Sequence, residues 1–377
     1  MNDISAKIGR WYDENKRNLP WRDTQDAYRI WLSEIILQQT RVAQGLEYYQ
    51  RFVERFPTVR DLAQASQDEV LKLWQGLGYY SRARNLHAAA QQVCLSEECG
   101  VRSEEYSSLT KDNAKNILFP TKYADLIKLK GVGPYTAAAI ASFSSDEKVA
   151  VVDGNVYRVL SRLFDIDTPI DSTKGQKDFL ALATQLLPDK HAGHHNQAMM
   201  ELGALCCTPT SPQCEACPVA DHCLALANHT IGQRPVKTGK VKVRERHLHY
   251  LIYIYKDMLW VHQRGEGDIW TGLWEFFLSE ELGVRSEEYS PLAKKNVPDS
   301  KQFLTPHSSF LIKHQLTHQT LFADFQVVPV KTEKEAEALD EKLQPMGYKR
   351  VTWMEWQELA VPRLIDEANR RIAEAWF

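Results

Sequence analysis

The stretch "LIKLKGVGPYTAAAIASF" at residues 126–143 decides the fold, because it places Gly131, Val132 and Gly133 between two segments with helical spacing. Glycines permit a tight turn there, and Pro134 suits the first position of the second helix. Free N–H groups at such a helix start can hold a phosphate. A nucleotide-binding loop is excluded, since no strand precedes the glycines and Gly-Lys-Ser/Thr is absent. The stretch therefore predicts two helices joined by a hairpin, which is either a plain corner or a phosphate-binding element.

The residues around this hairpin extend the helical pattern over most of a multidomain chain. Apolar residues recur at helical spacing from about 26 to 93, and again in several segments up to residue 205. After a basic run the pattern becomes β-rich, as in "HLHYLIYIYKDMLWVHQR" and "LTHQTLFADFQVVPV". We therefore expect an all-α domain over 1–229, a basic linker over 230–246 and a smaller α+β domain over 247–377. Such a linker is usually just solvated, but its position allows it to cross a phosphate backbone.

An internal duplication distorts the charge balance of the chain. "LSEECGVRSEEYSSLTKDN" at 95–113 recurs as "LSEELGVRSEEYSPLAKKN" at 278–296, with fifteen identical positions. Both copies are rich in Glu and Ser, so we expect surface loops inserted at about 95–116 and 278–299. They are either partner-binding segments or neutral insertions at loop tips. The chain has a net charge of −3, and residues 95–110 and 278–293 each contribute −3, so the rest of the protein is mildly basic.

Four cysteines lie within the stretch "CTPTSPQCEACPVADHC" at 207–223. We expect a cytoplasmic protein, because no window approaches the roughly eighteen apolar residues of a membrane span and the N-terminus has no apolar segment. Thiols stay reduced there, so the cluster indicates a metal or iron–sulfur site rather than disulfides. Structural zinc usually takes two paired knuckles, whereas this loop has a single C-x-x-C. The spacing alone leaves zinc and [4Fe–4S] open.

Two carboxylates stand in settings that suit acid chemistry. Glu34 has apolar neighbours in "IWLSEIILQQT", so desolvation should raise its pKa toward the range of a general acid; the alternative is an ion pair with an arginine such as Arg22. Asp153, in "AVVDGNVYRVL", either caps the following helix or faces a developing cation. Such a pair suits cleavage of a glycosidic bond, although periodicity does not show that the two converge. In "GLGYYSRARNL", Tyr79 suits a wedge into a base stack or a core tyrosine pair.

Taken in order, these motifs resemble the endonuclease III superfamily, the helix-hairpin-helix DNA glycosylases, and most closely its MutY-type adenine glycosylases. The resemblance covers residues 5–225 apart from the first insert. Besides the stretches quoted above, it is carried by "LPWR" at 19–22, "LWQGLGYYSRARNL" at 73–86 and "NQAMMELGALCC" at 196–207. It implies a [4Fe–4S] cluster whose ligands exclude Cys206 and are Cys207, Cys214, Cys217 and Cys223.

The same resemblance implies roles for the residues around the two carboxylates. Glu34 is the implied acid that protonates the adenine ring, and Asp153 the implied stabiliser of the sugar cation, with Asn155 near the sugar. Tyr135 stands where bifunctional relatives carry a Schiff-base lysine, which implies a monofunctional enzyme that leaves an abasic site. The adenine must be extrahelical to be reached. The other implied residues are Arg22 and Gln197 in the adenine pocket, and Gln39, Thr40, Tyr79, Gly131, Val132 and Gly133 on the DNA.

The C-terminal domain resembles the Nudix-like domain with which MutY-type enzymes recognise 8-oxoguanine opposite adenine. "GDIWTGLWEFF" at 267–277 carries this likeness, and no Nudix box of glutamates follows, so nucleotide hydrolysis is not expected. Where the family has Phe-Ser-His in the lesion-reading loop, this chain has Leu316, Thr317 and His318. The resemblance implies a monomeric DNA repair glycosylase that acts on A:8-oxoguanine or A:G mispairs in double-stranded DNA, without a membrane partner. The alternatives are a glycosylase for another base and a catalytically silent DNA-binding protein.

Overall fold

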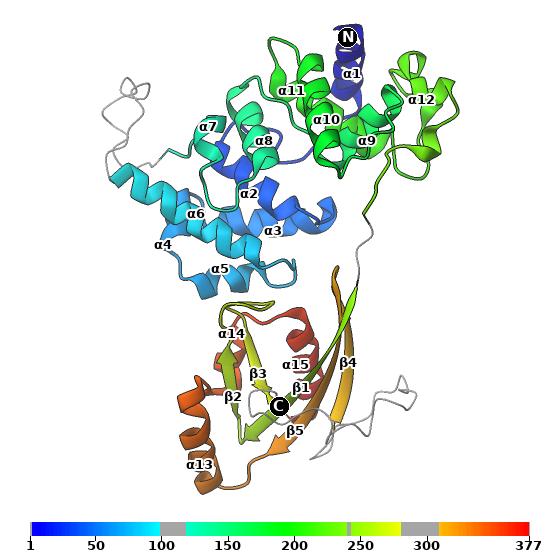
Figure 1. Ribbon diagram of the computed structural model, residues 1–377. Coiled ribbons are helices and arrows are strands. Elements are labelled where there is room, and N and C mark those ends of the chain that lie inside the picture. Colours follow the sequence, from blue (N-terminus) through cyan, green and yellow to red (C-terminus); the bar gives the residue numbers. More distant parts are fainter. Residues whose placement is uncertain (1, 99–117, 240–242, 280–308, 377) are drawn as a thin grey trace. The chain divides into compact units, whose positions relative to one another are not determined.

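The computed structural model describes residues 2–98, 118–239, 243–279 and 309–376, so most of both predicted inserts lies outside the described residues. The chain forms two compact units (Figure 1). The helical unit comprises Met1–Gln64 and Asn85–Lys240, and the sheet unit comprises Ala65–Arg84 and Val241–Phe377. Within the described ranges, no helix combines the length and the apolar character that crossing a membrane requires.

The helical unit is built from α-helices whose apolar faces meet in shared cores. Its helices are α1 (Asn2–Asn15), α2 (Ala27–Leu37), α3 (Val42–Arg55), α4 (Val59–Gln64), most of α6 (Ser81–Glu98), α7 (Tyr123–Leu126), α8 (Pro134–Ser145), α9 (Gly154–Leu163), α10 (Thr173–Leu186), α11 (Ala192–Leu205) and α12 (Leu224–Ala227). One core joins α1, α9, α10 and α11 through the fully buried Ile8, Leu160, Phe179 and Leu202. In this packing α1 contacts α11, and α11 contacts α9.

The predicted hairpin joins α7 to α8. Gly131 has a φ of +74°, and a Cβ there would lie 2.6 Å from the Cβ of Asn85, so both the backbone and the space favour glycine. Gly133 is the N-cap of α8, and Pro134 is the first residue of that helix. The helix therefore begins where the sequence predicted it.

The sheet unit contains one mixed sheet. The order of its six described strands is β4-β5-β1-β3-β2-β6. The strands are β1 (Arg244–Tyr255), β2 (Met258–Gln263), β3 (Trp274–Leu278), β4 (Ser309–Gln315), β5 (Gln319–Pro329) and β6 (Lys349–Thr352). The pairing of β1 with β5 is parallel and the other described pairings are antiparallel. The unit also contains α5 (Gln67–Trp74), α13 (Glu333–Leu343), α14 (Trp353–Glu358) and α15 (Arg363–Trp376), and α14 and α15 pack on the buried side chains of the sheet.

The boundaries of the compact units differ from the expected domains in two places. Residues 65–84 belong to the sheet unit, where Arg84 Nη1 donates to Thr271 O at 2.7 Å and Tyr80 Oη donates to Val361 O at 3.3 Å. Strand β1 begins at Arg244, inside the stretch expected as a linker. The pairing with β5 that starts there gives Arg244 a regular strand partner, which a sequence pattern of alternating charges does not reveal.

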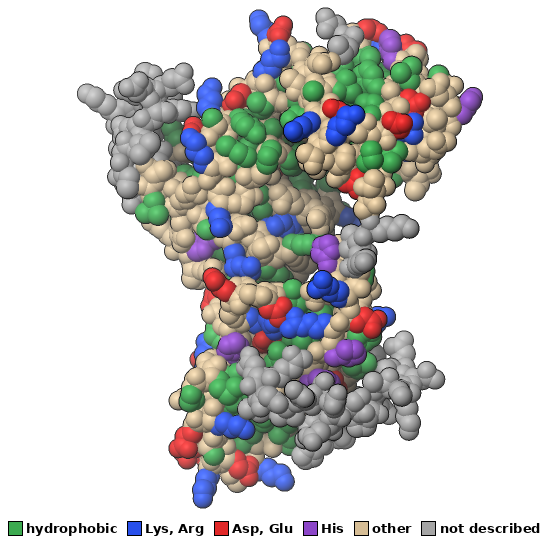
Figure 2. Space-filling view, viewed as in Figure 1, with side chains coloured by type: hydrophobic (Ala, Val, Ile, Leu, Met, Phe, Trp, Pro, Cys, Tyr) green, Lys and Arg blue, Asp and Glu red, His purple; other side chains and the backbone are tan. Residues whose placement is uncertain are grey.

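Charged side chains of both signs are mixed on the described surface in view. Figure 2 shows Lys and Arg close to Asp and Glu over both units. Ion pairs of the described chain include Lys148 with Asp189, at 2.6 Å, and Arg350 with the exposed Glu333, at 3.1 Å. Such pairs add little to stability, so the charges bear mainly on solubility and binding.

Candidate active site

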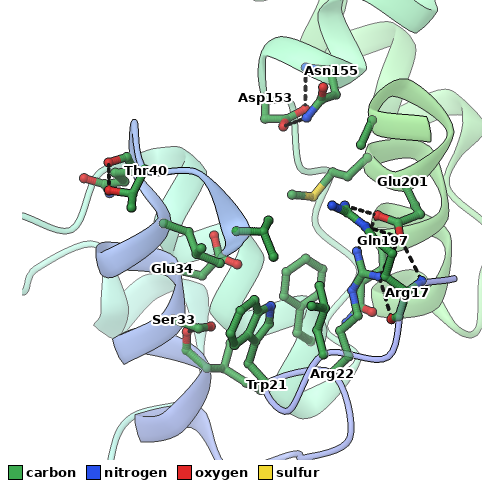
Figure 3. A pocket seen from close by; sticks show the side chains of 18 of the residues that line it. Arg17, Trp21, Arg22, Ser33, Glu34, Thr40, Asp153, Asn155, Gln197 and Glu201 are labelled. Carbon is green, nitrogen blue, oxygen red and sulfur yellow. Dashed lines mark hydrogen bonds and ion pairs between the residues drawn. The ribbon is translucent and has the colours of Figure 1, made fainter. Parts of the chain in front are cut away.

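A cavity of about 410 Å³ lies in the helical unit between α2, α8, the start of α9 and α11 (Figure 3). Glu34 from α2, Tyr135 from α8 and Asp153 at the start of α9 all line it, although they are far apart in the sequence. Its lining also includes five other residues that the sequence singled out, namely Arg22, Gln39, Thr40, Asn155 and Gln197. The fold therefore brings the expected catalytic and base-pocket residues into one cavity.

Glu34 is a buried acid with one hydroxyl partner. It lies in α2, which begins after the N-cap Asp26, and only 9% of its surface is exposed. Tyr135 Oη donates a hydrogen bond of 2.9 Å to Glu34 Oε2. Burial raises the pKa of Glu34 to about 7; the hydrogen bond from Tyr135 opposes this shift, and the nearby Asp153 adds to it. At neutral pH a large fraction of Glu34 therefore carries a proton that it can donate.

Asp153 caps a helix and faces the cavity at the same time. Its Oδ1 accepts from the backbone N–H of Asn155 at 2.9 Å and of Val156 at 2.8 Å, which is the bonding of an N-cap. Its Oδ2 accepts from Asn155 Nδ2 at 2.7 Å. Burial raises the pKa of Asp153, while these hydrogen bonds favour the ionised form. The two interpretations that the sequence left open are thus compatible.

Arg22 pairs with Glu201 and not with Glu34. Its Nη1 and Nη2 donate to the two carboxylate oxygens of Glu201 at 2.9 and 2.7 Å, and Arg17 Nε donates to the same carboxylate at 2.8 Å. Burial alone would raise the pKa of Glu201, but the hydrogen bonds from Arg22 and Arg17 lower it to about 2. Glu201 therefore stays ionised. In Figure 3, Glu34 and Glu201 lie on opposite sides of the cavity.

Sequence reasoning missed Glu201, Arg17 and Tyr12. Glu201 stands among apolar residues in "NQAMMELGALCC", the same signal that singled out Glu34, so it could have been found. Arg17 and Tyr12 carry no such signal, because their partners are more than 180 residues away in the chain. Tyr12 Oη donates a hydrogen bond of 2.6 Å to Gln197 Oε1.

The expected DNA-contacting residues fall into separate places. Gln39 and Thr40 line the cavity where α2 ends, and Gln39 has a positive φ of 55°. The glycines of the hairpin are not part of the cavity lining. Tyr79 belongs to the sheet unit, is 43% exposed and hydrogen-bonds through its hydroxyl to Thr317 Oγ1. Next to Thr317, Leu316 packs at the edge of the sheet core.

The cysteine stretch forms a compact loop after α11, with short 3-10 turns at Cys214–Ala216 and Ala220–His222. Burial raises the pKa of Cys223, and the thiols of Cys207, Cys217 and Cys214 raise it further. Arg162 of α9 donates to Cys207 Sγ at 3.4 Å. In the described ranges, no three His, Cys, Asp or Glu side chains converge as a single metal ion requires. Four half-buried thiols beside a guanidinium suit a negatively charged iron–sulfur cluster.

Helix α9 joins this loop to Asp153 through consecutive hydrogen bonds. Arg158 Nε donates to Cys207 O at 2.7 Å, and Arg158 Nη2 donates to Asn155 Oδ1 at 2.9 Å. The amide of Asn155 in turn donates to Asp153 at 2.7 Å. All three side chains therefore belong to the N-cap and the first two turns of one helix.

Three family models match successive parts of the chain. Residues 32–184 match the HhH-GPD superfamily of base excision DNA repair proteins, residues 207–223 the iron-sulfur binding domain of endonuclease III, and residues 249–373 the NUDIX domain. An adenine DNA glycosylase of Buchnera aphidicola subsp. Schizaphis graminum is 32% identical over 328 residues, which span 87% of this chain and 86% of that protein. The chain belongs to the adenine DNA glycosylase family.

Two further comparisons bear on this glycosylase. The human protein named adenine DNA glycosylase is 44% identical over 223 residues, 57% of this chain and 38% of that protein. A solved structure titled as a thermostable thymine-DNA glycosylase has a TM-score of 0.51 and 25% identity, over 60% of this chain and 95% of that one. The expected helix-hairpin-helix fold, the Nudix-like domain and an iron–sulfur site are therefore confirmed.

Proposed function

We propose that this glycosylase hydrolyses the N-glycosidic bond of adenine paired with 8-oxoguanine or guanine in double-stranded DNA, acting as a monomer. The observation that carries the proposal is Glu34, a buried acid whose pKa of about 7 leaves it partly protonated in the cavity that Asp153 also lines. The relatives at 32% and 44% identity that are named adenine DNA glycosylases support adenine as the base. Both carboxylates come from one chain, which is what a monomeric enzyme needs.

The proposed reaction begins with adenine turned out of the duplex, because its glycosidic bond is inaccessible inside the stack. Glu34 donates its proton to a ring nitrogen of adenine, so the electron pair of the breaking C–N bond passes to a neutral base. The sugar becomes an oxocarbenium-like cation, and the Asp153 carboxylate stabilises this charge until water adds to C1′. The proton that this water loses passes to the Glu34 carboxylate, which restores the acid. Hydrogen bonds from Asn155 keep the Asp153 carboxylate ionised and oriented.

We propose that the enzyme is monofunctional. A strand-cleaving mechanism needs an amine that attacks the sugar and forms a Schiff base. Position 135, where bifunctional relatives carry that lysine, holds a tyrosine whose hydroxyl donates to Glu34 at 2.9 Å. A phenol cannot form a Schiff base, so the expected product is an abasic site in an intact strand.

Recognition of the opposite base is proposed for Leu316, Thr317 and His318. The hydroxyl of Thr317 retains the hydrogen-bonding group of the serine in the family pattern, and it bonds to Tyr79, a residue suited to entering a base stack. Leucine replaces a stacking phenylalanine at position 316. We therefore expect the preference for 8-oxoguanine over guanine to depend more on hydrogen bonding than on stacking.

We propose that the iron–sulfur cluster is of the [4Fe–4S] type and is held by Cys207, Cys214, Cys217 and Cys223. Four thiolates from one compact loop suit such a cluster. In this role the cluster supplies structure, because Arg158 and Arg162 connect the loop to the helix that carries Asp153. Protein purified without oxygen should contain about four irons and four sulfides per chain.

The proposal is tested with a duplex that carries one adenine opposite 8-oxoguanine. We expect strand breakage only after hot alkali, because the product is an abasic site, and no breakage of a matched duplex with A opposite T. Glu34→Gln should bind the same duplex but release no adenine. Breakage without alkali would contradict the monofunctional mechanism, and failure of the wild-type protein to release adenine would contradict the proposed substrate.

A further inference from the structure

A buried tyrosine contacts Gln197 of the proposed adenine pocket without itself lining that pocket. Tyr12 of α1 is 3% exposed and lines a second cavity, of about 760 Å³, but not the cavity that holds Glu34. Gln197 lines both cavities, as do Arg22 and Phe143. These three side chains therefore form part of the wall between the two cavities, and Tyr12 lies behind it.

The hydrogen bond between Tyr12 and Gln197 determines which amide atom of Gln197 faces the first cavity. A phenol has a single proton, and burial raises the pKa of Tyr12, so its hydroxyl remains a donor. It donates to Gln197 Oε1 at 2.6 Å, which occupies the amide oxygen from behind. Since Oε1 and Nε2 diverge from the same carbon, Nε2 points away from Tyr12. No hydrogen bond recorded among the described residues uses Gln197 Nε2.

We propose that Tyr12 is a positioning residue that holds the amide of Gln197 with its N–H toward the base, so that the pocket offers a donor to a ring nitrogen of adenine. The inference rests on the proposed excision of adenine and specifies that the Gln197 amide presents its N–H, and not its oxygen, to the base. Without the Tyr12 hydroxyl, the amide of Gln197 can rotate by half a turn and present its oxygen instead, which repels a ring nitrogen.

The surroundings of Tyr12 allow its hydroxyl to be tested separately from its ring. The ring lies 5.7 Å from the guanidinium of Arg22 and makes an edge contact with His194, with ring centroids 5.1 Å apart. Phenylalanine keeps both contacts, because they use the ring and not the hydroxyl. Tyr12→Phe therefore removes the bond to Gln197 while leaving the support of Arg22 in place.

The experiment compares wild type, Tyr12→Phe, Gln197→Ala and the double variant in single-turnover excision. The full-length protein is given duplexes with adenine or unsubstituted purine opposite 8-oxoguanine. Purine keeps the ring nitrogens of adenine but lacks the exocyclic amino group. We expect Gln197→Ala to slow the excision of both bases by a similar factor of about 10, and Tyr12→Phe to slow it about 3- to 10-fold. The double variant should be no slower than Gln197→Ala.

A matched control is Tyr28→Phe, which removes another buried tyrosine hydroxyl, bonded to Phe56 O at 2.8 Å and outside the cavity lining. It should leave excision unchanged. Two results would overturn the inference. In the first, Tyr12→Phe slows excision equally in the presence and in the absence of the Gln197 side chain. In the second, Gln197→Ala slows the excision of adenine but not of purine, which would mean that the amide oxygen faces the base and bonds to the amino group. The second result is measured with wild type and Gln197→Ala alone, so it does not depend on whether the Tyr12→Phe variant folds. Wild-type protein that releases no adenine would refute the proposed function, and with it this inference.

Discussion

Two buried glutamates of one cavity have pKa values shifted in opposite directions. Glu34 has a hydroxyl as its partner, and burial raises its pKa to about 7, whereas Glu201 accepts from two guanidiniums and its pKa falls to about 2. Burial disfavours the charged form of both groups, and at Glu201 the hydrogen bonds from the two guanidiniums reverse that effect. The same residue type thus provides a proton donor on one side of the cavity and a fixed negative charge on the other.

The first prediction concerns the pH dependence of catalysis. Because Glu34 must be protonated to act as the acid, the single-turnover rate of base release should fall as pH rises through about 7. Well above that pH the rate should drop about tenfold per pH unit. A rate that stays constant from pH 6 to pH 9, measured at saturating enzyme, would rule out Glu34 as the titrating acid.

The second prediction concerns how the titration of Glu34 changes the stability of the protein. The pKa of Glu34 is about 7 in the folded protein, above the ordinary value of 4.5. The folded protein therefore binds this proton more tightly than the unfolded chain, and the proton adds to the free energy of unfolding at low pH. This added stability is lost as pH rises through about 7. Glu34→Gln removes the titration. Denaturation by urea should show the variant gaining stability relative to wild type between pH 5 and pH 8, by up to about 3 kcal/mol. An unchanged difference across this range would mean that Glu34 does not titrate there.

The third prediction concerns the pair formed by Arg22 and Glu201. Glu201→Ala leaves two guanidiniums without their buried counter-charge, so the free energy of unfolding should fall by about 3–5 kcal/mol. Urea denaturation at neutral pH measures this loss. Glu333→Ala, which removes the exposed partner of Arg350, serves as the control and should change stability little. Equal losses in the two variants would show that burial of the pair does not decide its contribution.

At the level of elements, the hairpin allows a fourth prediction with an internal control. Gly131 has a φ of +74° and no room for a Cβ beside Asn85, whereas Gly133 has a φ of −89° and no atom within 4 Å of a Cβ. Gly131→Ala should therefore lower the free energy of unfolding by about 1–3 kcal/mol, and Gly133→Ala should leave it nearly unchanged. Thermal or urea denaturation of the pair measures the difference, which disappears if the turn can relax.

The sequence predicted the elements better than the contacts between them. Spacing and capping signals located α8, and the apolar setting of Glu34 predicted its raised pKa, because both depend on near neighbours in the chain. The partner of Arg22 was not predictable in this way, since Glu201 lies 179 residues further on. Likewise, Asp153 shows its capping role in "DGN", but its place in the cavity depends on how α2 and α8 pack. Ordered motifs of a known family supplied what periodicity could not.

At the scale of the whole molecule, the two units have separate hydrophobic cores, and only one contains the cysteine loop. The core of the sheet unit lies between residues 248 and 372, while Cys207, Cys217 and Cys223 pack against the core of the helical unit. Iron removal should therefore act on one unit. We predict that calorimetry after chelation shows the transition of the helical unit lowered by about 10 °C or more, with that of the sheet unit unchanged. A common shift of both transitions would contradict this separation.

The double use of Asp153 has a consequence for how this protein can change over generations. The carboxylate that faces the cavity is also the N-cap of α9, so mutation at this position is opposed by selection for folding even where selection for chemistry has ended. Asn, Ser and Thr satisfy a cap almost as well as Asp. A lineage that had lost catalysis would therefore tend to drift among these four residues at position 153. Position 34, which caps no helix, would be released from that constraint, so its identity is the better marker of an active descendant.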